Sequence, residues 1–217
     1  MPSEVTTFLF DLDGTLCDSK PGLMHASRAA IAALGLECED PSVFLGAPLP
    51  VMFRTLSPHI DDLDIEYGLK VFRDVHRREG LSQMPLYDGV AEMLKALQQA
   101  GRSIWLATSK PQSIAEEVVS VLGISGYFDG ICGAGPDEKD RKADLIARAL
   151  KNSDTRAENA LMLGDRAFDV IGALENGVTP VGALWGYGSQ EELAEAGCVY
   201  FCQDVRDFLV QFVIPAL

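Results

Sequence analysis

The sequence lacks the features that mark membrane and exported proteins. No apolar run approaches the roughly 20 residues that a membrane-spanning helix needs. The N-terminal segment MPSEVTTFLF has no basic stretch ahead of its short apolar one, which does not fit a signal peptide. We therefore expect a protein that stays in the cytoplasm and does not enter a membrane.

Basic residues and paired cysteines are also scarce. Lysine and arginine total 18 against 32 aspartates and glutamates, which gives a formal net charge of −14. Binding to nucleic acid or to an anionic membrane needs a basic surface, so neither partner is expected. A small anionic substrate stays compatible, because its site can be locally positive. The five cysteines are odd in number and form no C-x-x-C pair, which favours free thiols in a reducing compartment.

Short apolar segments that end on polar residues alternate with helical patterns. The segments that read as strands cover residues 6–10, 102–107, 159–164 and 178–184. Helical patterns, several with proline at the start or glycine after the end, cover 88–101, 111–123, 141–152 and 167–177. This alternation predicts a parallel sheet with helices on both faces.

Residues 19–84 break this rhythm, because they contain helical patterns and no convincing strand. The joints of this block fall where Pro, Asp and Gly cluster, at 18–21 and 85–89. We therefore predict an α/β fold with a Rossmann-like, doubly wound parallel sheet and an inserted α-helical cap. The core domain would comprise 1–18 and 85–217, and the cap 19–84.

Polar side chains follow three of the predicted strands, at the edge of the sheet where ligands bind in such folds. Asp169 lies one helical turn after Asp165 and would return to the same edge of the sheet. Carboxylate oxygens with room for water and phosphate are what Mg²⁺ prefers. The strand-end residues are Asp11, Asp13, Thr108, Ser109 and Asp165.

An anion site among so many acids also needs a cation from the protein. Lys142, at the start of a helical pattern, is the first candidate, with Lys139 and Arg141 as competitors. Taken singly, these signals have plainer readings: an Asp-Gly turn after a strand, a strand-end turn at Thr108, or an acidic residue near a helix N-terminus at Asp169. Their order along the chain favours a site.

Four segments together resemble the motifs of the haloacid dehalogenase superfamily. They are DLDGT at 11–15, the strand ending in Thr108, a lysine ahead of a helix, and GDRAFD at 164–169. The helical insert is similar to the superfamily's cap of the first type. Further segments resemble its phosphoglycolate phosphatase-like branch: DGTLCDS at 13–19, LGAPLP at 45–50, PLYDGV at 85–90 and ALWGYGSQEEL at 183–193.

The resemblance implies a Mg²⁺-dependent phosphoric monoester hydrolase acting on a small phosphorylated metabolite. Asp11 would attack phosphorus to form an aspartyl-phosphate, and Asp13 would act as general acid and base. Residues implied to bind the phosphoryl group are Thr108, Ser109 and Lys142. Residues implied to hold Mg²⁺ are Asp11, Asp13 through its backbone carbonyl, Asp165 and Asp169.

The resemblance makes phosphoglycolate the first substrate candidate and leaves two alternatives open. These are a phosphotransferase of the β-phosphoglucomutase type and a pyrophosphatase of the same branch. Asp13 argues against dehalogenation, because the dehalogenases lack an acid there. Three departures from the branch weaken substrate assignment: Ser109 in place of a common asparagine, no Lys-Pro pair in the third motif, and Arg166 in place of a small hydroxyl residue. The sequence leaves a homodimer open.

Overall fold

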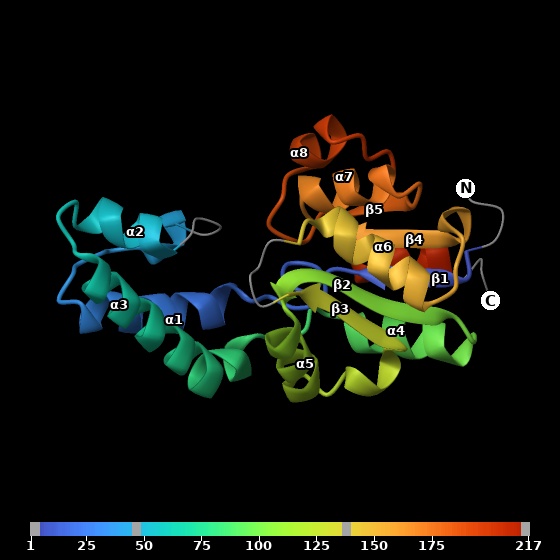
Figure 1. Ribbon diagram of the computed structural model, residues 1–217. Helices are drawn as coiled ribbons and strands as arrows, with labels where there is room; N and C mark the ends of the chain where they lie inside the picture. Colours follow the sequence, from blue (N-terminus) through green and yellow to red (C-terminus); the bar gives the residue numbers. More distant parts are fainter. Residues whose placement is uncertain (1–4, 45–48, 136–139, 214–217) are drawn as a thin grey trace. The chain divides into compact units, whose positions relative to one another are not determined.

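A computed structural model describes residues 5–44, 49–135 and 140–213. The chain divides into two compact units, one of residues 1–18 and 86–217 and one of residues 19–85 (Figure 1). We call the first the core unit and the second the helical unit. Among the described residues, no helix combines the length and the apolar character that crossing a bilayer requires. The segment LGAPLP, which resembles the phosphoglycolate phosphatase-like branch, lies mostly outside the described residues, and Lys139 lies outside them as well.

The core unit contains one six-stranded sheet in the order β3-β2-β1-β4-β5-β6, with every neighbouring pair parallel. This confirms the predicted fold class. The strands are β1 Thr7–Phe10, β2 Ser103–Pro111, β3 Gly130–Ala134, β4 Ala160–Gly164, β5 Thr179–Ala183 and β6 Phe201–Cys202. Its helices are α4 Val90–Gln99, α5 Gln112–Val121, α6 Lys142–Asn152, α7 Ala167–Glu175, α8 Gln190–Glu195 and α9 Val205–Phe208.

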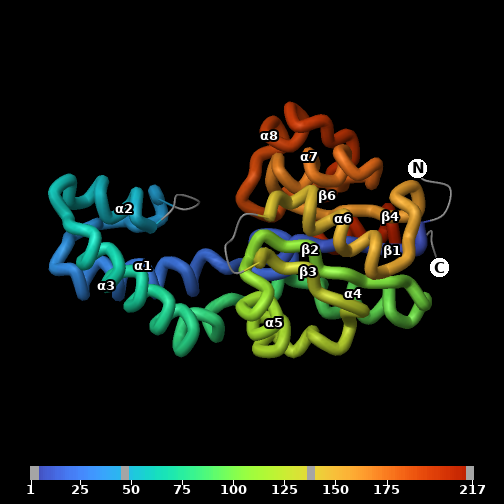
Figure 2. Tube along the Cα trace, viewed as in Figure 1, coloured from blue at the N-terminus to red at the C-terminus, as the bar shows by residue number. Residues whose placement is uncertain are grey.

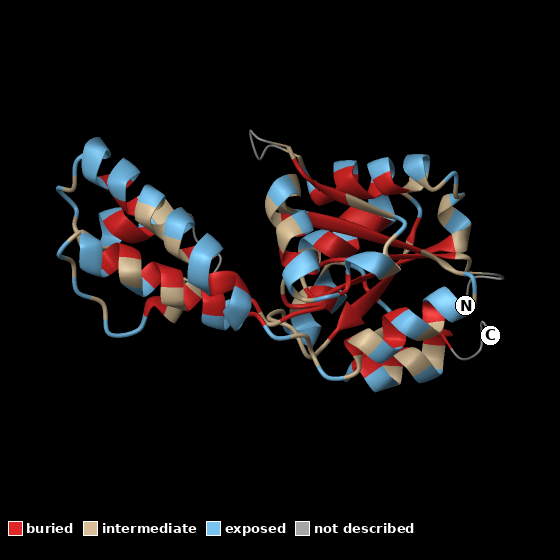
Figure 3. Ribbon diagram, turned by 90° about the horizontal axis from the view of Figure 1, so that it is seen from below, coloured by how far each residue is buried: buried red, intermediate tan, exposed pale blue. Residues whose placement is uncertain are grey.

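Helices cover both faces of this sheet (Figure 1). On one face, α6 and α7 pack over a cluster that includes Leu9, Trp105 and Met162. On the other face, α9 places Phe208 edge-on against Phe8 and Phe10. Helix α8 packs on the outer side of α7, as the chain trace shows (Figure 2). Because both faces are covered, the central strands are almost wholly buried (Figure 3), which explains their unbroken apolar sequences.

Two strands were not predicted, and one is longer than predicted. The segment GICGA forms β3 although two of its five residues are glycine, and β6 has only two residues. The strand predicted to end at 107 continues to Pro111 as β2. Its pairing with β3 is irregular at that end, because β2 advances from Thr108 to Pro111 while β3 advances only from Gly133 to Ala134.

The helical unit contains α1 Lys20–Ala33, α2 Leu49–Leu56 and α3 Asp62–Val75, and α3 continues into a π-helical turn, His76–Gly80. The unit has its own core, in which Ile31, Phe53 and Ile65 are buried. Gly68 lets the helices come close, since a Cβ there would lie 2.7 Å from Leu34 and 2.9 Å from Phe53. No strand occurs among its described residues.

Candidate active site

Strand β1 delivers Asp11 and Asp13 to the carboxyl edge of the sheet. The backbone N–H of Asp11 still donates to the carbonyl of Leu163 at 3.0 Å, so Asp11 continues the pairing between β1 and β4. The chain then turns sharply, and the amides of Leu16 and Cys17 both donate to the carbonyl of Leu12. The turn keeps Asp13 beside Asp11 without extending the strand.

Lys142 connects two of the aspartates. Its ammonium lies 2.8 Å from Asp11 Oδ1 and 2.9 Å from Asp169 Oδ1, and it donates to the carbonyl of Ala107 at 3.1 Å. Lys142 is buried at the N-terminus of α6. Burial alone would lower the pKa of Lys142, but the charges of Asp11 and Asp169 outweigh it and raise that pKa above its ordinary value. The ammonium is therefore charged, and it lies against two carboxylates and one carbonyl.

The two competitors of Lys142, Arg141 and Lys139, are not seen beside the aspartates among the described residues. Arg141 is exposed and forms an ion pair with Glu175 at 3.1 Å, so it does not join the aspartates. Lys139 lies outside the described residues. Lys142 is thus the predicted lysine that the structure brings to the aspartates.

Asp165 and Asp169 complete the acidic cluster. Asp165 follows β4 and Asp169 lies in the first turn of α7; both are buried. Carboxylate oxygens of Asp11, Asp165 and Asp169 all lie within 4.8 Å of one another. Burial, together with the charge of Asp11, raises the pKa of Asp165 to about 7; burial also raises the pKa of Asp169.

This cluster suits a divalent cation. Apart from the Lys142 ammonium, neither Asp11 Oδ1 nor Asp169 Oδ1 has a hydrogen-bond donor, although both atoms are buried. The cluster contains three buried carboxylates and one ammonium, which lies against two of them, so negative charge is in excess. An all-oxygen set of this kind fits Mg²⁺. The side chain of Asp13 is not part of the set.

The loop of residues 185–188 holds Asp165 from the other side, and sequence reasoning did not assign it a role. Tyr187 N–H donates to Asp165 Oδ2 at 2.8 Å, while the Thr15 hydroxyl donates to Asp165 Oδ1 at 3.0 Å. A Cβ on Gly14 or on Gly186 would collide with the Asp165 side chain. Gly14 also has φ +81°, a backbone conformation that favours glycine. The close approach therefore requires glycine at 14 and 186.

At the end of β2 the structure brings Thr108 and Lys110, and not Ser109, into the core. Thr108 is buried, and its hydroxyl accepts from the N–H of Lys110 at 3.3 Å. Ser109 is exposed, and among the described residues no hydrogen bond or ion pair joins it to the aspartates. Lys110 reaches Asp13 instead, with its ammonium 2.9 Å from Asp13 Oδ2. Sequence reasoning missed Lys110 because it placed these residues in the turn before a helix.

Carboxylates, a buried ammonium and a hydroxyl thus gather at the carboxyl edge of a doubly wound sheet, an arrangement that suits a small anionic ligand. A family model described as haloacid dehalogenase-like hydrolase matches residues 8–183. The chain belongs to the haloacid dehalogenase-like hydrolase family, as the motifs predicted.

Relatives place the chain in the phosphatase branch of this family. A 5′-nucleotidase from Pseudomonas aeruginosa is 34% identical over 91% of this chain and 90% of its own. A phosphoglycolate phosphatase from Vibrio vulnificus is 30% identical over 98% of both. Among solved structures, a haloacid dehalogenase-like hydrolase from Streptococcus pneumoniae superposes with a TM-score of 0.83 at 30% identity, covering 96% of this chain and 98% of that one. The protein is thus an enzyme with phosphatase relatives and resembles the phosphoglycolate phosphatases.

Proposed function

We propose that the protein is a Mg²⁺-dependent phosphatase that hydrolyses a small phosphate monoester through an aspartyl-phosphate on Asp11. One observation carries the proposal: the buried Lys142 ammonium joins Asp11 to Asp169, with Asp165 in the same cluster and Asp13 two residues away. The proposed nucleophile, the proposed acid and a cation would therefore act together at a strand end, where an open α/β sheet binds its ligand.

Asp11 and Asp13 would share the chemistry. A carboxylate oxygen of Asp11 attacks phosphorus, and the bond from phosphorus to the ester oxygen breaks as Asp13 gives that oxygen a proton. Asp13 then takes a proton from water, whose oxygen attacks the phosphorus of the aspartyl-phosphate. The P–O bond to Asp11 breaks, inorganic phosphate leaves, and Asp11 is free again.

The remaining residues would bind the phosphoryl group and Mg²⁺. Thr108 and Lys142 are the proposed donors to phosphoryl oxygens, with Ser109 as a weaker candidate because it is exposed. The Lys142 ammonium already lies against Asp11, Asp169 and the Ala107 carbonyl, so a phosphoryl oxygen would compete with these partners. The proposed Mg²⁺ ligands are Asp11, Asp165, Asp169 and the backbone carbonyl of Asp13. A bound Mg²⁺ supplies positive charge to the phosphoryl oxygens.

Two substrate classes are supported by the names of relatives. Phosphoglycolate is the first candidate, because the chain aligns with a phosphoglycolate phosphatase over 98% of both. A nucleoside 5′-monophosphate is the second, because the 5′-nucleotidase is 34% identical to this chain over 91% of it. Both are small phosphate monoesters. We place the reaction in the cytoplasm and assign the role of cap to the predicted cap domain, residues 19–84.

The test is phosphate release from a panel of phosphate compounds, with Mg²⁺ and with EDTA, using Asp11→Asn as the control. The panel contains phosphoglycolate, nucleoside 5′-monophosphates, pyrophosphate and hexose phosphates. We expect release that needs Mg²⁺ and disappears in Asp11→Asn. Isomerised hexose phosphate without phosphate release would instead identify a phosphotransferase, and release that survives Asp11→Asn would exclude the proposed nucleophile.

A further inference from the structure

Lys110 makes a contact that the proposed mechanism does not use. Its ammonium lies 2.9 Å from Asp13 Oδ2, and the side chain is only 7% exposed, against 28% for Asp13. Asp13 Oδ1 is buried and has no hydrogen-bond partner among the described residues. One oxygen of the proposed acid is therefore held by a cation, while the other stays available to exchange a proton.

The irregular end of β2 explains how Lys110 reaches this position. The extra residues of β2 opposite β3 are Ser109 and Lys110, and they displace the chain locally. Extended residues two apart point the same way, so Lys110 turns inward with Thr108 while Ser109 turns out. The space is tight, because a Cβ on Gly133 would lie 2.9 Å from the Lys110 carbonyl. Backbone packing thus fixes the position of the Lys110 backbone, from which its side chain extends toward Asp13.

We propose that Lys110 is a positioning residue for Asp13, which orients this carboxyl toward the ester oxygen that leaves and toward the water that later attacks. The inference rests on the proposed function, in which Asp13 is the general acid and base. It separates Lys110 from Thr108 and Lys142, which are proposed to bind the phosphoryl group itself.

This role predicts an effect that depends on the leaving group. An alkoxide leaves only with a proton from Asp13, whereas nitrophenolate leaves without one. In Lys110→Met, kcat/KM should therefore fall for an alkyl phosphate such as phosphoglycolate and change little for p-nitrophenyl phosphate. A catalytic group misplaced by about 1 Å can cost about 100-fold, which is the loss expected for the alkyl ester.

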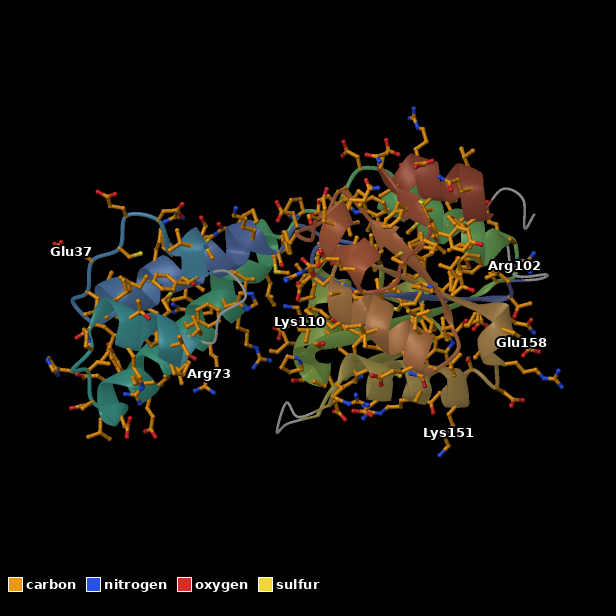
Figure 4. The ribbon with its side chains drawn as sticks, turned by 90° about the horizontal axis from the view of Figure 1, so that it is seen from above. Glu37, Arg73, Arg102, Lys110, Lys151 and Glu158 are labelled. Carbon is orange, nitrogen blue, oxygen red and sulfur yellow. The ribbon has the colours of Figure 1, made fainter. Side chains whose placement is uncertain are left out.

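A double-mutant cycle identifies the residue through which Lys110 acts. Lys110→Met, Asp13→Asn and the double variant are compared on both esters with saturating Mg²⁺. If Lys110 works through Asp13, the double variant is no slower on the alkyl ester than Asp13→Asn alone. The matched control is Lys151→Met, an exposed lysine of α6 that projects away from Lys110 (Figure 4).

Equal losses on both esters, or losses that multiply in the double variant, would overturn the inference. Thermal unfolding of each variant identifies any that fails to fold. Lys110→Gln then serves as a second variant, because its amide can still donate to Asp13 without a charge; a smaller loss, still confined to the alkyl ester, is expected, and equal losses on both esters again refute the role. Failure of the proposed function gives a different result, since wild-type protein would then release no phosphate in Mg²⁺, or Asp11→Asn would keep full activity.

Discussion

The ammonium of Lys142 offsets much of the negative charge in the acidic cluster. Asp11 and Asp169 each place one buried oxygen within 2.9 Å of it, and Asp165 adds a third buried carboxylate. Charges in such a place are costly unless a partner of opposite sign remains beside them. The same side chain thereby serves stability and the proposed phosphate binding.

Replacing Lys142 with methionine should therefore destabilise the protein as well as inactivate it. Breaking a buried ion pair on one side costs about 3–5 kcal/mol, and we expect that loss in EDTA. Mg²⁺ should restore part of it, because the cation would offset the uncompensated carboxylates. Urea unfolding with EDTA and with Mg²⁺ measures both terms, with Lys151→Met as the control. A variant as stable as wild type in EDTA would contradict this account of the cluster.

Glycines 14 and 101 allow the steric role of Gly14 to be separated from its backbone conformation. Both have positive φ, +81° and +66°, so alanine is strained at either position, by about 1–3 kcal/mol. Only at Gly14 would the new Cβ collide with Asp165, since Gly101 has nothing within 4 Å. We expect Gly101→Ala to keep activity and Gly14→Ala to lose it. Phosphate release and urea unfolding of the two variants test this, and equal activities would refute it.

At the scale of elements, the sequence predicted the sheet through its central strands. β1, β2, β4 and β5 are apolar runs that end on a polar residue or in a turn, and their type followed from that pattern. β3 was missed because its two glycines weaken the strand signal, and β6 because two residues form no pattern. Whether β3 and β6 form depends on the neighbouring strands and on backbone spacing. A local stretch of sequence shows neither of these two factors.

The acidic members of the candidate site were predictable and its supporting contacts were not. Asp11, Asp165 and Asp169 share one edge because parallel strands end there. Lys110 reaches Asp13 only through an irregular pairing between β2 and β3, which no local pattern signals. The contact of Tyr187 with Asp165 joins residues 22 positions apart through a loop. Such contacts depend on tertiary packing.

Helix α8 supports the start of α7 through one side chain, Glu192. Its Oε1 accepts from the N–H of Ala167 and from Nε of Arg166, both at 2.9 Å. The backbone N–H of Arg166 in turn donates to Asp169 Oδ2 at 3.0 Å. Glu192 therefore fixes the turn that carries Asp165 and Asp169 through its hydrogen bonds to Arg166 and Ala167, and not through those carboxylates themselves.

Glu192→Ala should weaken Mg²⁺ binding without removing a proposed ligand. Loss of a group that orients metal ligands typically costs about 10–100-fold in metal affinity or activity. We expect the Mg²⁺ concentration for half-maximal activity to rise by about tenfold or more, with kcat at saturating Mg²⁺ reduced less. Glu195→Ala, an exposed residue of the same helix, is the control. An unchanged Mg²⁺ requirement in Glu192→Ala would show that the turn between β4 and α7 keeps its conformation without Glu192.

At the scale of the whole molecule, every described member of the candidate site belongs to the core unit. The aspartates, Thr108, Lys110 and Lys142 all lie within residues 1–18 and 86–217. The two ends at which the helical unit is inserted lie side by side in the core unit. Cys17 pairs with Leu86 in an antiparallel bridge, and the N–H of Tyr87 donates to the carbonyl of Leu16 at 3.1 Å.

This arrangement predicts that the core unit folds without residues 19–85. Antiparallel partners are about 5 Å apart, so a Gly-Ser loop of about four residues can join Asp18 to Leu86. We expect the shortened protein to unfold cooperatively on heating and to melt at a higher temperature in Mg²⁺ than in EDTA, because the acidic cluster is intact.

If residues 19–85 select the substrate, the ratio of kcat/KM for phosphoglycolate to that for p-nitrophenyl phosphate should fall in the shortened protein. Calorimetry with and without Mg²⁺, followed by kinetics on both esters, separates these claims. A chain that melts without a cooperative transition would make the helical unit part of the fold, and an unchanged ratio would place substrate selection in the core unit.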